Sequence, residues 1–444
     1  MISNINQRTS LIIKNVTASF FVKGWSAVIV LLMVPLTLKM LGAYNNGVWL
    51  TISGILVWID YMDIGLGNGL RNAMAKYVAL GDNNKARMAV SSTFFILTII
   101  IIPLLLLLCS AIQIFDFYNV LGINKAIVPK LDYILTIALV LTSTTFILKA
   151  IGNVYMGLQL PAVSNLIVCI GQTLSLIITY IAYLLGCHSL LYVVLINTLS
   201  PLITWGAFFP YTFFYRYPQY RPSISFIDKK MSRLLCSQGI KFFVLQIFSV
   251  VLFASVNIII SKLFSPSEVT PYQIAYRFFS LVLVLFNIIA MPFWNATTDA
   301  YNREDLLWIK KSSRFLDITV CVSLLLLVVM VCLSPFVYSL WIGQEVEIPL
   351  TLSVAMASYI FVLIVSLRYS YILNGINVLK IQLVFTIFAT IAFIPLSLWA
   401  GYTFNNVTSI VWIMCFINVP GMIANTWKYY KIFYKKWNMS VTQK

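Results

Sequence analysis

The chain has 444 residues, of which 61% are hydrophobic and only 10% are charged, and its formal net charge is +17. A water-soluble domain has about a quarter of its residues charged, so this composition excludes an ordinary soluble protein. The excess of Lys and Arg is explained by membrane topology and by attraction to anionic lipid, and it does not require a nucleic acid as a partner.

Apolar stretches of roughly 20 residues follow one another along the whole chain, about twelve in all. Each is long enough to cross a ~30 Å hydrocarbon core as a helix. Because backbone polar groups in lipid must be hydrogen-bonded within the protein, we expect helices here. The predicted fold class is therefore an all-α polytopic membrane protein. In chain order the predicted spans are 17–39, 47–66, 91–111, 132–155, 162–185, 190–214, 241–263, 271–297, 315–341, 349–373, 381–400 and 407–430.

The positions of Lys and Arg predict how these spans are oriented. With the N-terminus inside the cell, 23 of the 30 basic residues fall in cytoplasmic segments and four fall in external ones. This bias follows the positive-inside rule and predicts that both termini are cytoplasmic. Residues 70–88 combine basic and apolar residues at helical spacing, so we expect one amphipathic helix there, lying on the inner leaflet.

Matches at a nearly constant spacing predict an internal repeat. Lys39 ends the first predicted span, and Lys262 ends the seventh, half the chain further on. Lys149 lies near the inner end of span four, and Arg368 lies at the same place in span ten, again half the chain further on. Two halves in the same orientation are common in transporters, with the substrate site between them. The predicted organisation is an N-terminal six-helix lobe, residues 1–222, followed by a C-terminal six-helix lobe, residues 223–444.

The loops and the scarce residue types exclude most catalytic sites. The loops are too short to hold a domain, and the phosphate-binding pattern G-x-x-x-x-G-K-[ST] does not occur. His188 is the only histidine, and the seven cysteines form no C-x-x-C pair, so a metal site built from these residues is not expected. We therefore predict a protein that is not an enzyme and that uses no cofactor.

Residues 47–72 read GVWLTISGILVWIDYMDIGLGNGLRN. This segment, above all from Asp63 to Asn72, resembles the second-helix region of Wzx-type O-antigen and polysaccharide flippases. That family belongs to the superfamily that also holds the MATE multidrug exporters and the lipid II flippase. The resemblance implies a pseudo-repeat of two six-helix lobes that work by alternating access.

The activity that the resemblance implies is movement of an undecaprenyl-diphosphate-linked oligosaccharide across the bacterial cytoplasmic (inner) membrane. Such a cargo is a unit of lipopolysaccharide O-antigen, capsule or exopolysaccharide, and it moves from the inner to the outer leaflet. The expected driving force is a proton or sodium gradient. The expected partners besides the cargo are membrane lipids, a glycan polymerase and chain-length proteins.

Ionisable residues inside the spans are candidate functional residues, because burying a charge in a membrane is costly. Lys23, Lys149, Arg277 and Arg368 are the candidates for binding the pyrophosphate of the cargo. For Lys23, Lys149 and Arg368, snorkelling to the headgroups is an alternative explanation. Asp60 and Asp63 share one face of span two and are the candidates for ion coupling. Their alternative role is a salt bridge to the segment around Arg71.

Two other classes of function remain open. One is a MATE-type antiporter of small molecules or ions, and the other is a membrane enzyme of glycan assembly, such as a polymerase. The deep charges are mostly basic, which favours an anionic cargo over a drug cation, and the short external loops disfavour a polymerase. Near the inner helix ends, Asp299 and Asp317 are expected to form salt bridges with Arg303 or Arg314.

Overall fold

A computed structural model of the chain is helical throughout its described residues, with no strand among them, which confirms the all-α prediction. The described residues are 2–60, 66–236, 255–302, 304–376, 378 and 380–442. Only the backbone is described for residues 2–20, 60, 68, 292, 295, 296, 298, 299, 302 and 434–442. The chain forms two compact units, here called unit 1 (residues 1–250) and unit 2 (residues 251–444). The lobe boundary between residues 222 and 223 stays a prediction.

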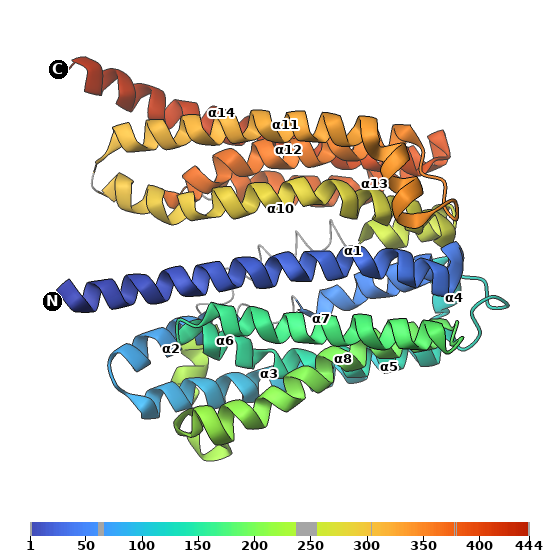
Figure 1. Cartoon of the computed structure of the whole chain (residues 1–444), viewed down its shortest axis with the longest axis horizontal. Coiled ribbons are helices and arrows are strands. Elements are labelled where there is room, and N and C mark those ends of the chain that lie inside the picture. Colours follow the sequence, from blue (N-terminus) through green and yellow to red (C-terminus); the bar gives the residue numbers. More distant parts are fainter. Residues whose placement is uncertain are drawn as a thin grey trace. The chain divides into compact units, whose positions relative to one another are not determined.

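Unit 1 begins with α1 (Ile2–Asp60), which consists of two helices joined at Gly42. The φ of Gly42 is 69°, a left-handed conformation that glycine adopts without a steric penalty. The chain turns back there, as the blue ribbon shows (Figure 1), so α1 supplies the first two predicted spans. The other elements are α2 (Leu66–Ala79), α3 (Asn83–Ile114), α4 (Phe117–Leu121), α5 (Leu131–Leu148), α6 (Ala150–Gly157), α7 (Pro161–Leu184), α8 (Leu190–Pro210), and the short turns η1 (Tyr211–Arg216), η2 (Pro218–Tyr220) and η3 (Ile224–Phe226).

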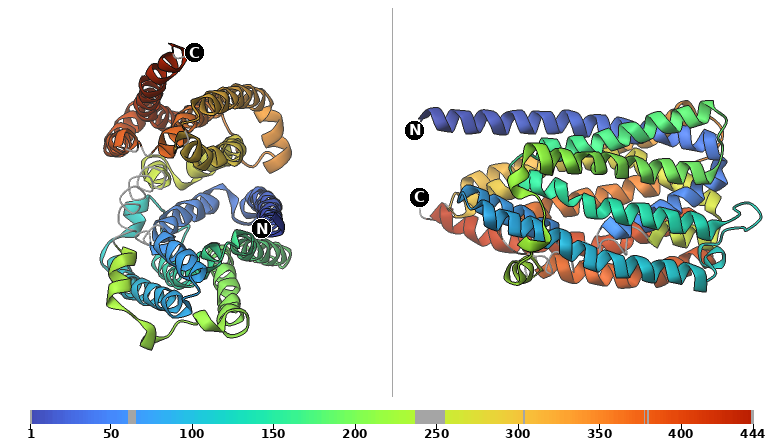
Figure 2. Two further views of the ribbon diagram at one scale, coloured as in Figure 1. Left: turned by 90° about the vertical axis from the view of Figure 1, so that its left-hand side faces the viewer. Right: turned by 90° about the horizontal axis from the view of Figure 1, so that it is seen from below.

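Unit 2 is a bundle of long helices in which α12 occupies the centre and packs against α10, α11 and α14. Its elements are a helical segment at 255–263, α10 (Pro266–Asn302), α11 (Leu306–Ile342), α12 (Leu350–Gly375), α13 (Lys380–Phe404) and α14 (Val407–Thr442). The long helices within each unit run roughly along one direction (Figure 2). Most of the seventh predicted span, 241–263, lies outside the described residues.

Ten helical segments of the described chain are long and apolar enough to cross a membrane. One of them, Phe21–Ile59, covers two predicted spans because it includes the turn at Gly42. About twelve spans therefore remain consistent with the structure. The protein is a multi-pass membrane protein.

The same turn joins a pair of helices in each unit, at corresponding positions of the two halves of the chain. Gly81 (φ 70°) precedes Asp82, whose carboxylate accepts a hydrogen bond from the backbone N–H of Lys85 at 3.0 Å. Glu304 (φ 60°) precedes Asp305, whose carboxylate accepts a hydrogen bond from the backbone N–H of Trp308 at 2.9 Å. The carboxylates cap α3 and α11 by satisfying N–H groups that have no partner in the helix.

This turn corrects the prediction of a single amphipathic helix over 70–88. A left-handed residue ends α2 after Ala79, and a capping aspartate starts a new helix at Asn83. The amphipathic pattern itself is present within α2, whose buried hydrophobic residues lie on one helix face: Leu66, Leu70, Ala73, Met74 and Tyr77. The backbone N–H and the ammonium of Lys85 hold the pKa of the Asp82 carboxyl below its usual value.

A glycine lets two helices approach closely in each unit. A Cβ on Gly157, the last residue of α6, would lie 2.4 Å from Cβ of Met74 and 2.9 Å from the carbonyl oxygen of Arg71 on α2. A Cβ on Gly375, the last residue of α12, would lie 2.8 Å from Cβ of Thr297 and from the carbonyl oxygen of Trp294 on α10. The two contacts hold corresponding helix pairs together in the two units.

Candidate functional site

Arg368 is a fully buried cation at the centre of unit 2. It lies on α12 and is only 1% exposed. Its guanidinium stacks over the ring of Tyr369, 4.0 Å from the ring centroid, and over the ring of Tyr429, at 4.7 Å. Such aromatic faces stabilise a desolvated cation, so α12 and α14 together provide part of the charge compensation.

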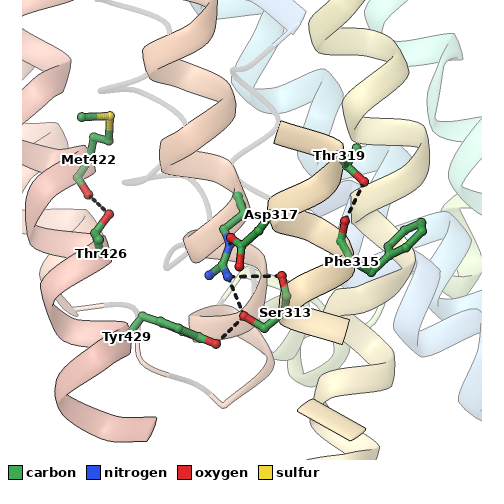
Figure 3. A network of polar contacts seen from close by, with 8 residues as sticks. Ser313, Phe315, Asp317, Thr319, Met422, Thr426 and Tyr429 are labelled. Carbon is green, nitrogen blue, oxygen red and sulfur yellow. Dashed lines mark hydrogen bonds and ion pairs between the residues drawn. The ribbon is translucent and has the colours of Figure 1, made fainter. Parts of the chain in front are cut away.

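The remaining compensation for Arg368 comes from α11. Nε of Arg368 lies 2.7 Å from Oδ1 of Asp317, but its N–H is not aligned for a hydrogen bond, so this contact is an ion pair only. Nη2 donates to the carbonyl oxygen of Ser313 at 3.3 Å and to its hydroxyl at 2.5 Å. The Ser313 hydroxyl also hydrogen-bonds the Tyr429 hydroxyl (Figure 3). One guanidinium thus connects α11, α12 and α14.

The position of Asp317 corrects the sequence prediction. Asp317 pairs with Arg368 of another helix, and among the described residues it forms no ion pair with Arg314; Arg303 lies outside those residues. The side chain of Asp299 lies outside the described residues. The contribution of Ser313 and Tyr429 was not predicted. Ser313 and Asp317 are four residues apart and share a helix face, which is a usable signal. Nothing in the sequence places Tyr429 of α14 beside them.

A cavity of about 320 Å³ opens beside this network. It is lined by Lys310, Lys311, Ser313, Arg314, Asp317, Arg368, Tyr429 and Tyr430. Lys311 and Arg314 are exposed, whereas Arg368 lies at the buried side. The cavity therefore has a strongly cationic lining.

Lys149, the residue of unit 1 that the repeat predicts to correspond to Arg368, has a different environment. It is half-buried and stands at the break between α5 and α6, where the regular helix is interrupted. It lines a cavity of about 350 Å³ together with Gly67, Leu97, Phe146, Ala150, Asn153 and Val168. Apart from Lys149, the polar side chain in this lining is that of Asn153. This cavity therefore has one cation and a largely apolar wall.

Arg277 lies on α10 and is half-buried. Among the described residues, no carboxylate contacts its guanidinium. Tyr272 and Tyr276 stack on each other in the preceding part of α10, with ring centroids 6.4 Å apart. The buried hydroxyl of Tyr359 on α12 has no hydrogen-bond partner in the described structure. A cation and buried phenol groups thus occupy the same part of unit 2.

The other predicted site residues are less well placed. Lys23 is exposed on α1. Asp60 is the last residue of α1, and only its backbone is described. Asp63 lies outside the described residues. The structure therefore brings Arg368 together with Asp317. Of the four predicted cations, Lys23 and Lys149 belong to unit 1, whereas Arg277 and Arg368 belong to unit 2.

Comparison with solved structures identifies the fold. The chain is similar to an inward-facing multidrug resistance MATE family transporter of the MOP superfamily, with a TM-score of 0.77 and 14% identity over 92% of this chain and 95% of that one. It is also similar to a MATE protein in the straight conformation (TM-score 0.64, 16% identity, 96% of each chain) and to an outward-facing MATE family transporter (TM-score 0.64, 14% identity, 96% of each chain). No protein-family model and no curated protein matches the chain. The all-helical chain has the fold of the MATE transporters.

Proposed function

We propose that the protein moves a polyprenyl-diphosphate-linked oligosaccharide between the leaflets of a bacterial cytoplasmic membrane by alternating access. The observation that supports this most strongly is Arg277, a cation without an acidic neighbour among the described residues, inside a membrane-spanning helix of a MATE-like fold. The Wzx-like segment at 47–72 supports the same class of cargo.

The chemistry of the cargo agrees with basic residues in the spans. A pyrophosphate carries about two negative charges and cannot enter hydrocarbon unless cations or water compensate them. In this proposal Lys23, Lys149 and Arg277 contact the pyrophosphate at different stages. Arg368 contacts it only when its ion pair with Asp317 opens. The polyprenyl tail remains in lipid while the glycan crosses through polar space.

A gradient must change the relative stability of the two access states in order to drive transport, because a bound ion shifts an equilibrium only through its differential affinity. We propose that Asp60 and Asp63 bind the proton or sodium ion. They are neighbouring carboxylates at the end of the second span, and Asp63 begins the most family-like part of the sequence.

The second candidate function is a MATE-type antiporter of small cations, and the solved structures with the same fold favour it. A site for a drug cation needs a carboxylate that is available inside the spans. Asp317 is engaged by Arg368, whereas Arg277 lacks an acidic partner among the described residues. These two residues therefore support an anionic cargo.

The first experiment tests the charge of Arg277. Arg277→Ala is expected to reduce flipping, measured as accumulation of lipid-linked glycan in cells that lack their own flippase, while Arg277→Lys retains part of the activity. Lys keeps the point charge but loses the bidentate geometry of the guanidinium. Lys125→Ala, a change at an exposed cation outside the spans, is the matched control. Unchanged flipping by Arg277→Ala at normal membrane yield contradicts the proposal.

The second experiment tests coupling. Asp60→Asn and Asp63→Asn are expected to preserve membrane yield and cargo binding but to remove the dependence of flipping on a proton or sodium gradient in vesicles. A structural salt bridge to the Arg71 segment predicts loss of folded protein instead. Full gradient-driven transport by both variants would falsify the coupling role.

A further inference from the structure

The cavity beside Arg368 has the charge of an anion-binding site. Four cationic residues, Lys310, Lys311, Arg314 and Arg368, and one carboxylate, Asp317, line it, leaving a net charge of +3. Because Lys311 and Arg314 are exposed while Arg368 is only 1% exposed, positive charge extends from the mouth to the buried side. Asp317, the one carboxylate of the lining, is engaged by the deepest cation, so the lining keeps an excess of positive charge.

The cavity also offers hydrogen-bond donors and enough space for a phosphate group. The buried Nη1 of Arg368 has no hydrogen-bond partner among the described residues. Ser313 and Tyr429 line the same space, and their hydroxyls fix the guanidinium of Arg368 at its buried side. The volume of about 320 Å³ corresponds to that of about ten waters at ~30 Å³ each. Cationic donors that converge on one space suit an anion with several acceptor oxygens.

The length of α11 places this cavity at the depth of lipid headgroups. A helix of 37 residues is about 55 Å long, whereas the hydrocarbon core is about 30 Å thick. The predicted span within α11 is 315–341, so the charged turns before it, residues 306–314, are expected to extend beyond the hydrocarbon. Tyr430, which lines the cavity, is 47% exposed, and Trp427, one turn earlier on α14, is 55% exposed. A ligand here meets positive charge and apolar surface together, which suits an amphiphile.

Unit 1 fills the corresponding face with its own chain. The alignment that places Asp82 on Asp305 also places Arg87, Met88 and Ser91 on Lys310, Lys311 and Arg314. Arg87 donates from Nε to the carbonyl oxygen of Arg221 at 2.8 Å and stacks over the ring of Phe226 at 4.0 Å. Ser91 accepts a hydrogen bond from the backbone N–H of Ser223 at 3.1 Å. In the described part of unit 2, no chain segment takes the place of residues 221–226, and the face is cationic instead.

We propose that this cavity binds the phosphodiester headgroup of an anionic phospholipid from the leaflet that this end of unit 2 meets. Lys311 and Arg314 contact the phosphate, and Arg368, held by Asp317 and Ser313, provides the fixed positive charge behind them. The lipid tails lie along Tyr430 and Trp427 of α14. This site shares Arg368 with the proposed cargo path, but lipid occupancy is measured without cargo and does not depend on the proposed flipping activity.

The test counts lipids bound to the full-length protein. Purified protein in detergent is mixed with phosphatidylglycerol, and bound lipid is measured by native mass spectrometry. The double change Lys311→Gln with Arg314→Gln is expected to weaken binding roughly tenfold or more, since each interfacial cation contributes on the order of 1 kcal/mol and 1.4 kcal/mol is tenfold. Lys428→Gln with Lys431→Gln is the matched control, because it removes the same charge from the same end of unit 2 without altering the cavity lining. The control is expected to change binding less than about twofold.

Two further measurements show whether the cavity binds a lipid headgroup or a free phosphate ion. Zwitterionic phosphatidylcholine is expected to bind weakly to the native protein and equally to both double variants. Excess inorganic phosphate is expected not to displace phosphatidylglycerol. If free phosphate displaces the lipid completely, the site is one for a free anion and the lipid assignment is wrong. If both double variants lose phosphatidylglycerol equally, the attraction is general surface charge and the site does not exist.

Discussion

The two units share the geometry of a helix turn and of a close helix contact, but they differ in the surroundings of their basic residues. At corresponding positions, both have a left-handed residue followed by a capping aspartate, Gly81 and Asp82 in unit 1 and Glu304 and Asp305 in unit 2. Each also has a helix-ending glycine in close contact with an earlier helix. The basic residues near these glycines diverge, because Arg368 is buried and ion-paired whereas Lys149 is half-buried at a helix break.

The difference teaches that a repeat preserves backbone geometry more closely than electrostatics. A cap or a close helix contact depends on one residue and the local backbone, so it persists in both units. A buried cation depends on partners from several helices, and Ser313, Asp317 and Tyr429 exist in unit 2 without equivalents beside Lys149 in the cavity lining. Matching sequence positions therefore need not have matching roles.

The largest expected effect comes from removing the buried cation of unit 2. Arg368→Met leaves Asp317 without its partner and separates α11 from α12 and α14, so we expect a loss of stability of about 2–3 kcal/mol. The value lies below the roughly 3–5 kcal/mol for a fully buried pair because the Asp317 side chain is 50% exposed and can be hydrated. Arg368→Lys is expected to rescue little, because one ammonium cannot contact Asp317 and Ser313 as the guanidinium does. Thermal unfolding in detergent measures both, and an unfolding temperature unchanged by Arg368→Met contradicts a structural role.

The next effect tests whether the shared glycine contacts are equivalent. Gly157→Ala and Gly375→Ala each force a Cβ into atoms 2.4–2.9 Å away, so each is expected to cost roughly 1–3 kcal/mol of stability. Gly206→Ala on α8 is the control, because its Cβ would meet no atom within 4 Å and alanine favours a helix. Thermal unfolding of the three variants should therefore separate two destabilised proteins from one that is unchanged or more stable. Unequal losses at Gly157 and Gly375 would show that the contacts have diverged.

Much of this framework is predictable from sequence, whereas the site is less so. Hydropathy alone finds the spans, because each must cover the hydrocarbon core, and the near-constant spacing relates Lys149 to Arg368. The turn at 80–82 was missed, although Gly81 before Asp82 is a recognisable signal of a helix end and a new cap. The partner of Asp317 is Arg368 and not the predicted Arg314, because contacts between α11 and α12 depend on helix packing, which residue spacing along one helix does not encode.

A smaller structural effect, with a larger functional one, is expected at Lys149. Lys149→Gln shortens a half-buried side chain by one atom and keeps it polar, so we expect a change in stability below about 1 kcal/mol. If Lys149 contacts the cargo pyrophosphate, flipping should fall about tenfold, because one charge-assisted contact is lost. Lipid-linked glycan accumulation measures transport, and thermal unfolding measures stability. Loss of stability comparable with that of Arg368→Met would mean that the two cations have the same role after all.

The smallest effect distinguishes the two shared turns. Glu304 has a side chain at a φ of 60°, a conformation that costs an ordinary L-residue roughly 1 kcal/mol, whereas Gly81 adopts its φ of 70° without that cost. Glu304→Gly is therefore expected to raise stability by at most about 1 kcal/mol, since the added flexibility of the unfolded chain offsets part of the relief. Gly81→Ala is expected to lower stability by a similar amount, although a Cβ there would touch no atom within 4 Å. Opposite changes in stability for the two substitutions would show that backbone strain, and not side-chain packing, causes the effect. If both substitutions destabilise the protein, the exposed Glu304 side chain makes a favourable contribution at this turn that outweighs its strained backbone, and the two turns differ in more than their glycine.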